Sequence, residues 1–161
     1  MIDSRVSSTS FLIEVDRACT KVALSDDLIC SRLTDVLRGE GVSGGEVSVS
    51  IIGHQQMHEL NVKFLSHDYP TDVLSFRLDD RDDLRHVEGE VIVSAEMAID
   101  QAAEFGWSAE NELMYYLLHG TLHLCGYDDH TDADIAQMRQ RESHYLQSWG
   151  LPRSGNEGAS H

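Results

Sequence analysis

The stretch from Ser108 to Leu124 constrains the fold of this chain more than any other segment. It is a helix-forming stretch whose apolar side chains lie almost all round the helix rather than along one stripe. They are Leu113, Met114, Leu117, Leu118, Leu122 and Leu124. A helix without a solvent face has to be covered on every side by other elements. The sequence therefore predicts a central, buried helix around which the remaining elements pack.

Four short segments have the patterns of β-strands: 11–15, 46–52, 72–76 and 88–94. The stretch 46–52 alternates strictly between apolar and polar residues, which is typical of a strand with one buried face. The last two strands are joined by an acidic connection, 79–83, and this arrangement predicts a hairpin.

Helices are predicted between and after these strands. Ser25 and Ser94 stand where N-caps are expected, and Thr131 with Asp134 has the spacing of a capping box. A shorter helix is expected over 54–64. Together these patterns predict an α+β fold, in which a small mixed four-stranded sheet packs against about five helices. At this length we expect one domain over 1–161, with loose ends at about 1–9 and 152–161.

Composition argues against several kinds of partner. The 161 residues carry 12 basic and 28 acidic side chains, and the formal net charge of −16 argues against a general nucleic-acid binder. An enzyme that meets RNA in one local cleft remains compatible with this charge. No apolar run approaches the roughly 20 residues that cross a bilayer, so no membrane partner is expected. Three widely spaced cysteines and an N-terminus without a secretory pattern predict a cytoplasmic protein.

The chemistry is concentrated at the end of the buried helix, in HGTLHLCGYDDH over 119–130. His119 and His123 are four residues apart, so their rings project from one helix face, as in HxxxH zinc sites. Gly126 can adopt the left-handed conformation that ends the helix and turns the chain back. Two histidines on a buried helix can also be hydrogen-bonded core residues, but the pair followed by this turn favours a metal site. Glu112 on the same stripe is either a partner of the site or a polar first-turn residue, whereas Tyr115 and Tyr116 are expected in the core.

The third ligand has two candidates, Asp129 and His130. Metzincin-type zinc sites follow H-x-x-x-H-x-x-G-x-x-H, and this register places Gly126 correctly and Asp129 in the third position. His130 is the better zinc donor by type but lies one residue late. We predict Asp129 as the ligand, with His130 as the alternate. In HExxH peptidases the residue after the first histidine is the general base, whereas here it is Gly120.

The motif HGTLHLCGYDDH resembles the H-G-x-L-H-L-x-G-Y-D-H signature of the YbeY family of bacterial metal-dependent endoribonucleases, which take part in ribosomal RNA maturation. The stretches Leu60–Asn61, 67–76 and 89–94 resemble further motifs of that family. The resemblance covers about 47–150, and the first 45 residues match only in pattern. It implies zinc ligands at His119 and His123, with Asp129 where the family usually has histidine. It also places Leu65 where many members have an arginine thought to hold RNA.

The resemblance implies a single-strand-type endoribonuclease that acts in ribosomal RNA processing and ribosome quality control. One zinc ion per chain would supply its bound water as the catalytic group, and no protein base is assigned. Candidate substrate-binding residues are Lys63, His67, Asp72 and Arg77. The implied partners are ribosomal RNA and the small ribosomal subunit, with a basic ribosomal protein as a further candidate. The alternatives are a ribosome-assembly factor with a structural metal and, disfavoured by Gly120, a zinc peptidase. Nickel suits the same donors.

Overall fold

The computed structural model describes residues 11–65, 72–79 and 85–151, so the predicted loose ends at 1–9 and 152–161 lie outside the described residues. The strands are β1 (Phe11–Arg17), β2 (Gly44–Ile52), β3 (Val73–Arg77) and β4 (His86–Ser94). The helices are α2 (Asp26–Gly39), α3 (His54–Leu60), α4 (Ala95–Phe105), α5 (Ala109–Leu124) and α6 (Asp132–Ser148), with a short π-helix η1 (Asn61–Leu65) after α3.

The four strands form one mixed sheet in the order β1-β2-β4-β3. β1 and β4 both run parallel to β2, and β3 is antiparallel to β4. The first parallel pair is joined by α2, and β3 and β4 form the predicted hairpin. The α+β fold with a mixed four-stranded sheet and five helices is therefore confirmed for the described residues.

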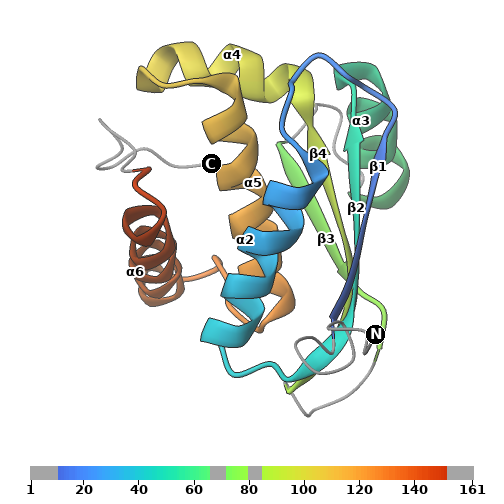
Figure 1. Ribbon diagram of the computed structural model, residues 1–161. Helices are drawn as coiled ribbons and strands as arrows, with labels where there is room; N and C mark the ends of the chain where they lie inside the picture. Colours follow the sequence, from blue (N-terminus) through green and yellow to red (C-terminus); the bar gives the residue numbers. More distant parts are fainter. Residues whose placement is uncertain (1–10, 66–71, 80–84, 152–161) are drawn as a thin grey trace, which may run out of the picture.

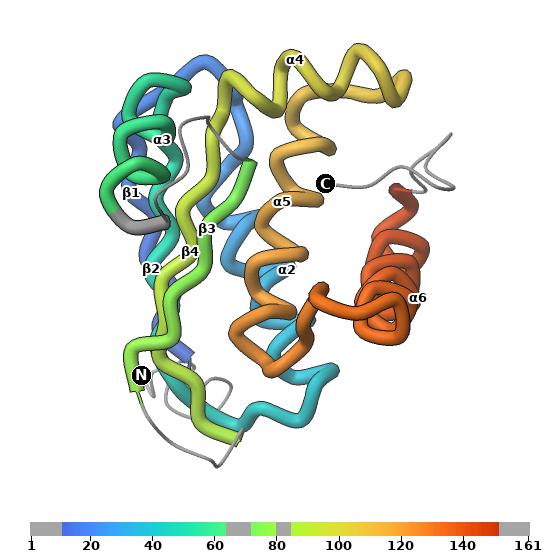
Figure 2. The backbone as a smooth tube through the Cα atoms, turned by 180° about the vertical axis from the view of Figure 1, so that it is seen from behind, coloured from blue at the N-terminus to red at the C-terminus, as the bar shows by residue number. Residues whose placement is uncertain are grey.

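The helices cover the two faces of the sheet unequally. α2 and α5 lie side by side against one face, α3 covers part of the other face, and α6 lies outside α5 and α2 (Figures 1 and 2). The main core fills the space between the sheet and helices α2 and α5, with Val47, Val49 and Ile51 pointing in from β2. None of the helices in the described ranges combines the length and apolar character needed to cross a membrane.

Helix α5 is the buried centre of the molecule, as its composition predicts. Eleven of its residues are buried, and they face the sheet, α2, α4 and α6. Its approach to the sheet depends on Gly120. A Cβ atom there would lie 2.6 Å from Cγ1 of Val91 and 2.9 Å from Oγ of Ser75. The Ser75 hydroxyl donates to the Gly120 carbonyl at 3.0 Å, which fixes α5 on β3.

The helix termini follow the predicted capping residues. The side chains of Ser25, Ser94 and Thr131 each accept a backbone hydrogen bond at the start of a helix, and Thr131 forms a full capping box with Asp134. The helix predicted over 54–64 instead changes from α to π at Asn61. The buried Asn61 amide donates to the Met57 carbonyl at 2.8 Å, at the point where the helical hydrogen bonding changes.

We expect Gly120→Ala to lower the free energy of unfolding by about 1–3 kcal/mol, the usual range for overpacking a filled core. The added methyl group would force α5 away from Val91 and Ser75. Urea denaturation measures the change, with Glu104→Ala on the exposed face of α4 as the control. Unchanged stability of Gly120→Ala would contradict this account of how α5 packs on the sheet.

Candidate metal centre

The last turns of α5 bring two imidazole rings together at the edge of the buried helix. The Nε2 atoms of His119 and His123 lie 3.1 Å apart, and the rings meet edge to face. Their side chains are 16% and 24% exposed, so the surrounding protein covers most of each ring. The i, i+4 spacing thus produces the paired nitrogens that the sequence predicts.

A Schellman turn then folds the chain back over the histidines. Gly126 adopts φ 105°, its N–H donates to the His123 carbonyl, and the Tyr127 N–H donates to the Leu122 carbonyl. These two bonds define the motif. The left-handed conformation predicted for Gly126 is therefore present, and it directs the following residues toward the two rings.

Asp129 completes a triangle with the two histidines. Its Oδ2 atom lies 3.7 Å from Nε2 of His119 and 3.4 Å from Nε2 of His123, and the three side chains form a potential metal site. Ligand atoms about 2.0–2.1 Å from a tetrahedral zinc ion are about 3.3 Å from one another. The three separations therefore fit one face of such a tetrahedron, and the donors fit a borderline divalent cation without rearrangement.

A buried carboxylate from α6 orients the first histidine. Oε2 of Glu142 lies 2.6 Å from Nδ1 of His119, and Oε1 accepts from the Tyr115 hydroxyl at 3.0 Å. The Glu142 side chain is only 3% exposed, so both of its oxygens require partners within the protein. A proton on Nδ1 of His119 leaves Nε2 facing the triangle with its lone pair, the arrangement seen where a carboxylate supports a metal-binding histidine.

The carboxylates also set the protonation of the metal-free site. Burial lowers the pKa of His119, but hydrogen bonds to Asp129 and Glu142 and the charges of Glu142 and Asp72 outweigh it and raise the pKa to about 9. Burial and the charge of His119 lower the pKa of His123. Hydrogen bonding to His119 lowers the pKa of Asp129 to about 2. Without a cation, the site therefore holds a proton on His119 between two carboxylates.

Other residues near the motif have different roles. His130 is exposed and is not in the triangle. Glu112 is fully buried and accepts from the Trp107 indole at 2.7 Å, at the opposite end of α5 from the triangle. The supporting carboxylate is instead Glu142, which the sequence analysis did not identify. A signal for it exists, because Glu142 lies four residues after Met138 on the buried stripe of α6.

The four candidate substrate-binding residues are placed differently. Asp72 is half-buried and close enough to His119 for its charge to raise that pKa. Lys63 is exposed on η1, whereas His67 lies outside the described residues, as does the side chain of Leu65. Arg77 donates to Asp79, to the Leu124 carbonyl at 3.1 Å and to the His86 carbonyl at 2.9 Å. Its guanidinium thus fastens β3 to β4 and to the end of α5.

These features define a class of protein: an α+β fold with a candidate His-His-Asp cation site at the end of a buried helix. The family model described as Endoribonuclease YbeY matches residues 16–150. The chain belongs to the YbeY family. The match begins well before Val47, where the motif resemblance starts, so most of the N-terminal part also belongs to the family domain.

Individual relatives agree with this assignment. A protein of Chloroherpeton thalassium named Endoribonuclease YbeY is 36% identical over 78% of this chain and 87% of its own. One of the same name from Roseiflexus castenholzii is 35% identical over 93% of this chain and 100% of its own. A Thermotoga maritima protein of known solution structure superposes with a TM-score of 0.57 at 26% identity, covering 87% of this chain and 91% of that one.

We expect the wild-type protein to bind one equivalent of zinc and Asp129→Ala to lose most of the zinc affinity. Asp129 is in the triangle and His130 is not, so His130→Ala is the matched control and keeps the wild-type stoichiometry. Zinc titration against a competing chelator measures both. If His130→Ala empties the site while Asp129→Ala does not, Asp129 is not the third ligand.

Zinc affinity should rise with pH, because zinc requires neutral imidazole and displaces the proton from His119. With a His119 pKa of about 9, we expect affinity to increase about tenfold per pH unit from pH 7 and to level off above about pH 9. Calorimetry at pH 7 in two buffers of different ionisation enthalpy should detect about one released proton.

The same proton links pH to folding. The pKa of His119 in the folded protein is raised from 6.5, so the contacts of its protonated ring with Asp129 and Glu142 stabilise the metal-free fold. This stabilisation is fully present below pH 6.5 and is lost as pH rises through about 9. Denaturation of the chelator-treated protein at pH 6 and pH 10 tests this direction. If zinc binds without releasing a proton and the metal-free protein is equally stable at both pH values, His119 does not carry the additional proton assigned to it.

Proposed function

We propose that the chain cleaves single-stranded regions of ribosomal RNA, with one zinc ion held by His119, His123 and Asp129. As a member of an endoribonuclease family, it is a hydrolase that acts on RNA. The observation that carries the zinc proposal is the triangle of three ligand atoms with separations of 3.1, 3.4 and 3.7 Å. Three protein ligands leave one tetrahedral position open, which is typical of catalytic rather than structural zinc sites.

Each residue of the site has a role in this proposal. His119, His123 and Asp129 would hold the zinc ion, which would supply Lewis-acid chemistry and an activated water as nucleophile, so that no protein base would be needed. Glu142 holds the proton of His119 at Nδ1, so Nε2 remains a ligand. Tyr115 donates to the other Glu142 oxygen and keeps that carboxylate in place. Asp72 adds negative charge beside His119.

A peptidase function is not favoured by the position of Gly120. In HExxH enzymes this position carries the glutamate that acts as general base. Here it faces Val91 and Ser75 of the sheet at distances that leave no room even for a Cβ atom. A base at this position would point into the core rather than toward the cation site.

The site must attract RNA to a protein with a net charge of −16. Such a charge disfavours long contacts with phosphate backbones, and the three hydrogen-bonding partners of Arg77 hold that cation within the fold. We therefore propose that the protein meets RNA locally, in the cytoplasm, while associated with the small ribosomal subunit. A basic ribosomal protein is the partner whose charge complements the acidic surface.

An RNA-cleavage assay tests this function. We expect zinc-loaded wild-type protein to cut structured ribosomal RNA at single-stranded regions, to leave casein intact, and to lose activity with a chelator. The Asp129→Ala variant should cleave RNA more than about 100-fold more slowly than the wild type. This loss is larger than the one typical when a residue that only hydrogen-bonds to a metal ligand is removed. His130→Ala is the control and should retain activity.

Two results would contradict the proposal. One is RNA cleavage that survives metal removal and Asp129→Ala, which would place the reaction elsewhere. The other is zinc binding with no RNA cleavage under any of these conditions, which would favour an assembly factor with a structural metal.

A further inference from the structure

A further carboxylate with a mostly buried side chain, Glu40, lies at the C-cap of α2. The side chain of Glu40 is 8% exposed. It accepts hydrogen bonds from the Tyr127 hydroxyl at 2.7 Å, from the Tyr145 hydroxyl at 2.6 Å, and from Nε and Nη2 of Arg141 at 3.0 and 2.6 Å. These donors come from two segments, the turn after α5 and helix α6, so one carboxylate joins three parts of the chain.

Both segments that Glu40 holds carry a residue of the cation site. Tyr127 lies two residues before Asp129, the third corner of the triangle. Arg141 is adjacent to Glu142, whose carboxylate orients His119. The separations in sequence from Glu40 are 87 residues for Tyr127 and 101 for Arg141, so this contact is a purely tertiary link.

The position of Asp129 depends on such a tertiary link more than the positions of the two histidines do. His119 and His123 are fixed by α5, whereas Asp129 lies in the irregular connection between α5 and α6 and its side chain is 43% exposed. The connection is fixed at its start by the Schellman turn and at its end by the Thr131 capping box. At its start, the hydroxyl of Tyr127, the last residue of the Schellman turn, also ties the connection to α2.

We propose that Glu40 is a positioning residue for the cation site, acting on Asp129 through Tyr127 and on Glu142 through Arg141. This inference rests on the proposed zinc site. Glu40→Gln turns one of the two carboxylate oxygens into an amide donor, so either the Tyr127 hydroxyl on Oε1 or the Arg141 guanidinium on Oε2 loses its acceptor, and buried donors without partners move to find others. The movement displaces the turn and α6 relative to α5, and the triangle opens while the two histidines stay in place.

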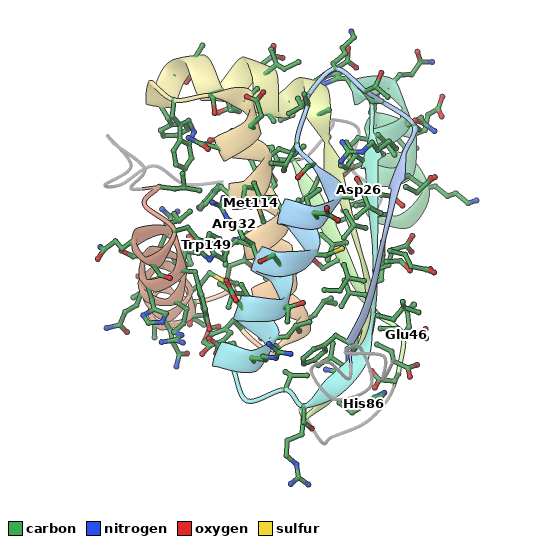
Figure 3. The ribbon with its side chains drawn as sticks, in the orientation of Figure 1. Asp26, Arg32, Glu46, His86, Met114 and Trp149 are labelled. Atoms are coloured by element: carbon green, nitrogen blue, oxygen red, sulfur yellow. The ribbon has the colours of Figure 1, made fainter. Side chains whose placement is uncertain are left out.

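A second contact between α2 and α6 provides a matched control. The Trp149 indole donates to Asp35 at 3.2 Å, and the Arg32 guanidinium lies over the Trp149 ring at 5.2 Å, between these two helices (Figure 3). This contact joins the same helices at the C-terminal end of α6, away from the turn that carries Asp129. A change at Asp35 therefore reports the effect of loosening α6 alone.

The experiment compares two pairs of variants in the full chain. Glu40→Gln removes the positioning carboxylate, and Asp35→Asn makes the same chemical change at the control contact. Tyr127→Phe removes the hydroxyl that ties the turn to Glu40. Tyr116→Phe removes a buried hydroxyl on α5 that donates to the Met97 carbonyl of α4. Zinc affinity is measured by chelator competition, folding by thermal unfolding of the metal-free protein, and geometry by the visible spectrum of the cobalt-substituted protein.

We expect Glu40→Gln and Tyr127→Phe to weaken zinc binding by about 10–100-fold, the loss typical for outer partners of metal ligands, and to change the cobalt spectrum. Asp35→Asn and Tyr116→Phe should retain wild-type affinity and spectrum, even where they lower the melting temperature. If Glu40→Gln and Tyr127→Phe lower only the melting temperature, Glu40 is structural and the inference is wrong. Wild-type protein that binds no zinc would overturn the zinc site itself, and the positioning role with it.

Discussion

The burial of α5 is the constraint on which the rest of this structure depends. Its apolar side chains leave no face for solvent, so the sheet, α2, α4 and α6 all pack against it. Gly120 allows the closest approach, to β3 and β4. Because that side of the helix is filled by the sheet, His119 and His123 emerge on a different side, where α6 and the turn after Gly126 can reach them.

Burial of an entire helix also forces its polar side chains to find partners inside the protein. The Tyr115 hydroxyl and Nδ1 of His119 both form hydrogen bonds with the Glu142 carboxylate, and Glu112 accepts a hydrogen bond from the Trp107 indole. The contacts of Tyr115 and His119 with Glu142 therefore join α6 to α5 in addition to the apolar residues of α6. The carboxylate that orients His119 is thus also part of the packing of the last helix.

The parts of this structure that local patterns govern could be predicted from the sequence. Capping residues located the starts of α2, α4 and α6, the i, i+4 histidines and Gly126 indicated the site, and the register after Gly126 favoured Asp129 over His130. Glu142 and Glu40 could not be found in this way. They contact partners 23 to 105 residues away, and no spacing rule connects residues that only tertiary packing brings together. Local periodicity likewise does not reveal the switch to a π-helix at Asn61, where the buried side chain donates to the Met57 carbonyl.

The charges around the candidate site bear on how an acidic chain would meet the phosphates of RNA under the proposed function. Asp129 and Glu142 contact His119, and Asp72 acts on it from nearby, so three carboxylates surround one imidazole. In the metal-free state a proton on His119 offsets one of these charges. In the proposed site, a divalent cation would replace that single positive charge with two. Recognition of RNA would then depend on the interaction of one phosphoryl group with the cation rather than on a wide basic surface. This explains why the net charge of −16 argues against general RNA binding and not against cleavage of RNA at one point.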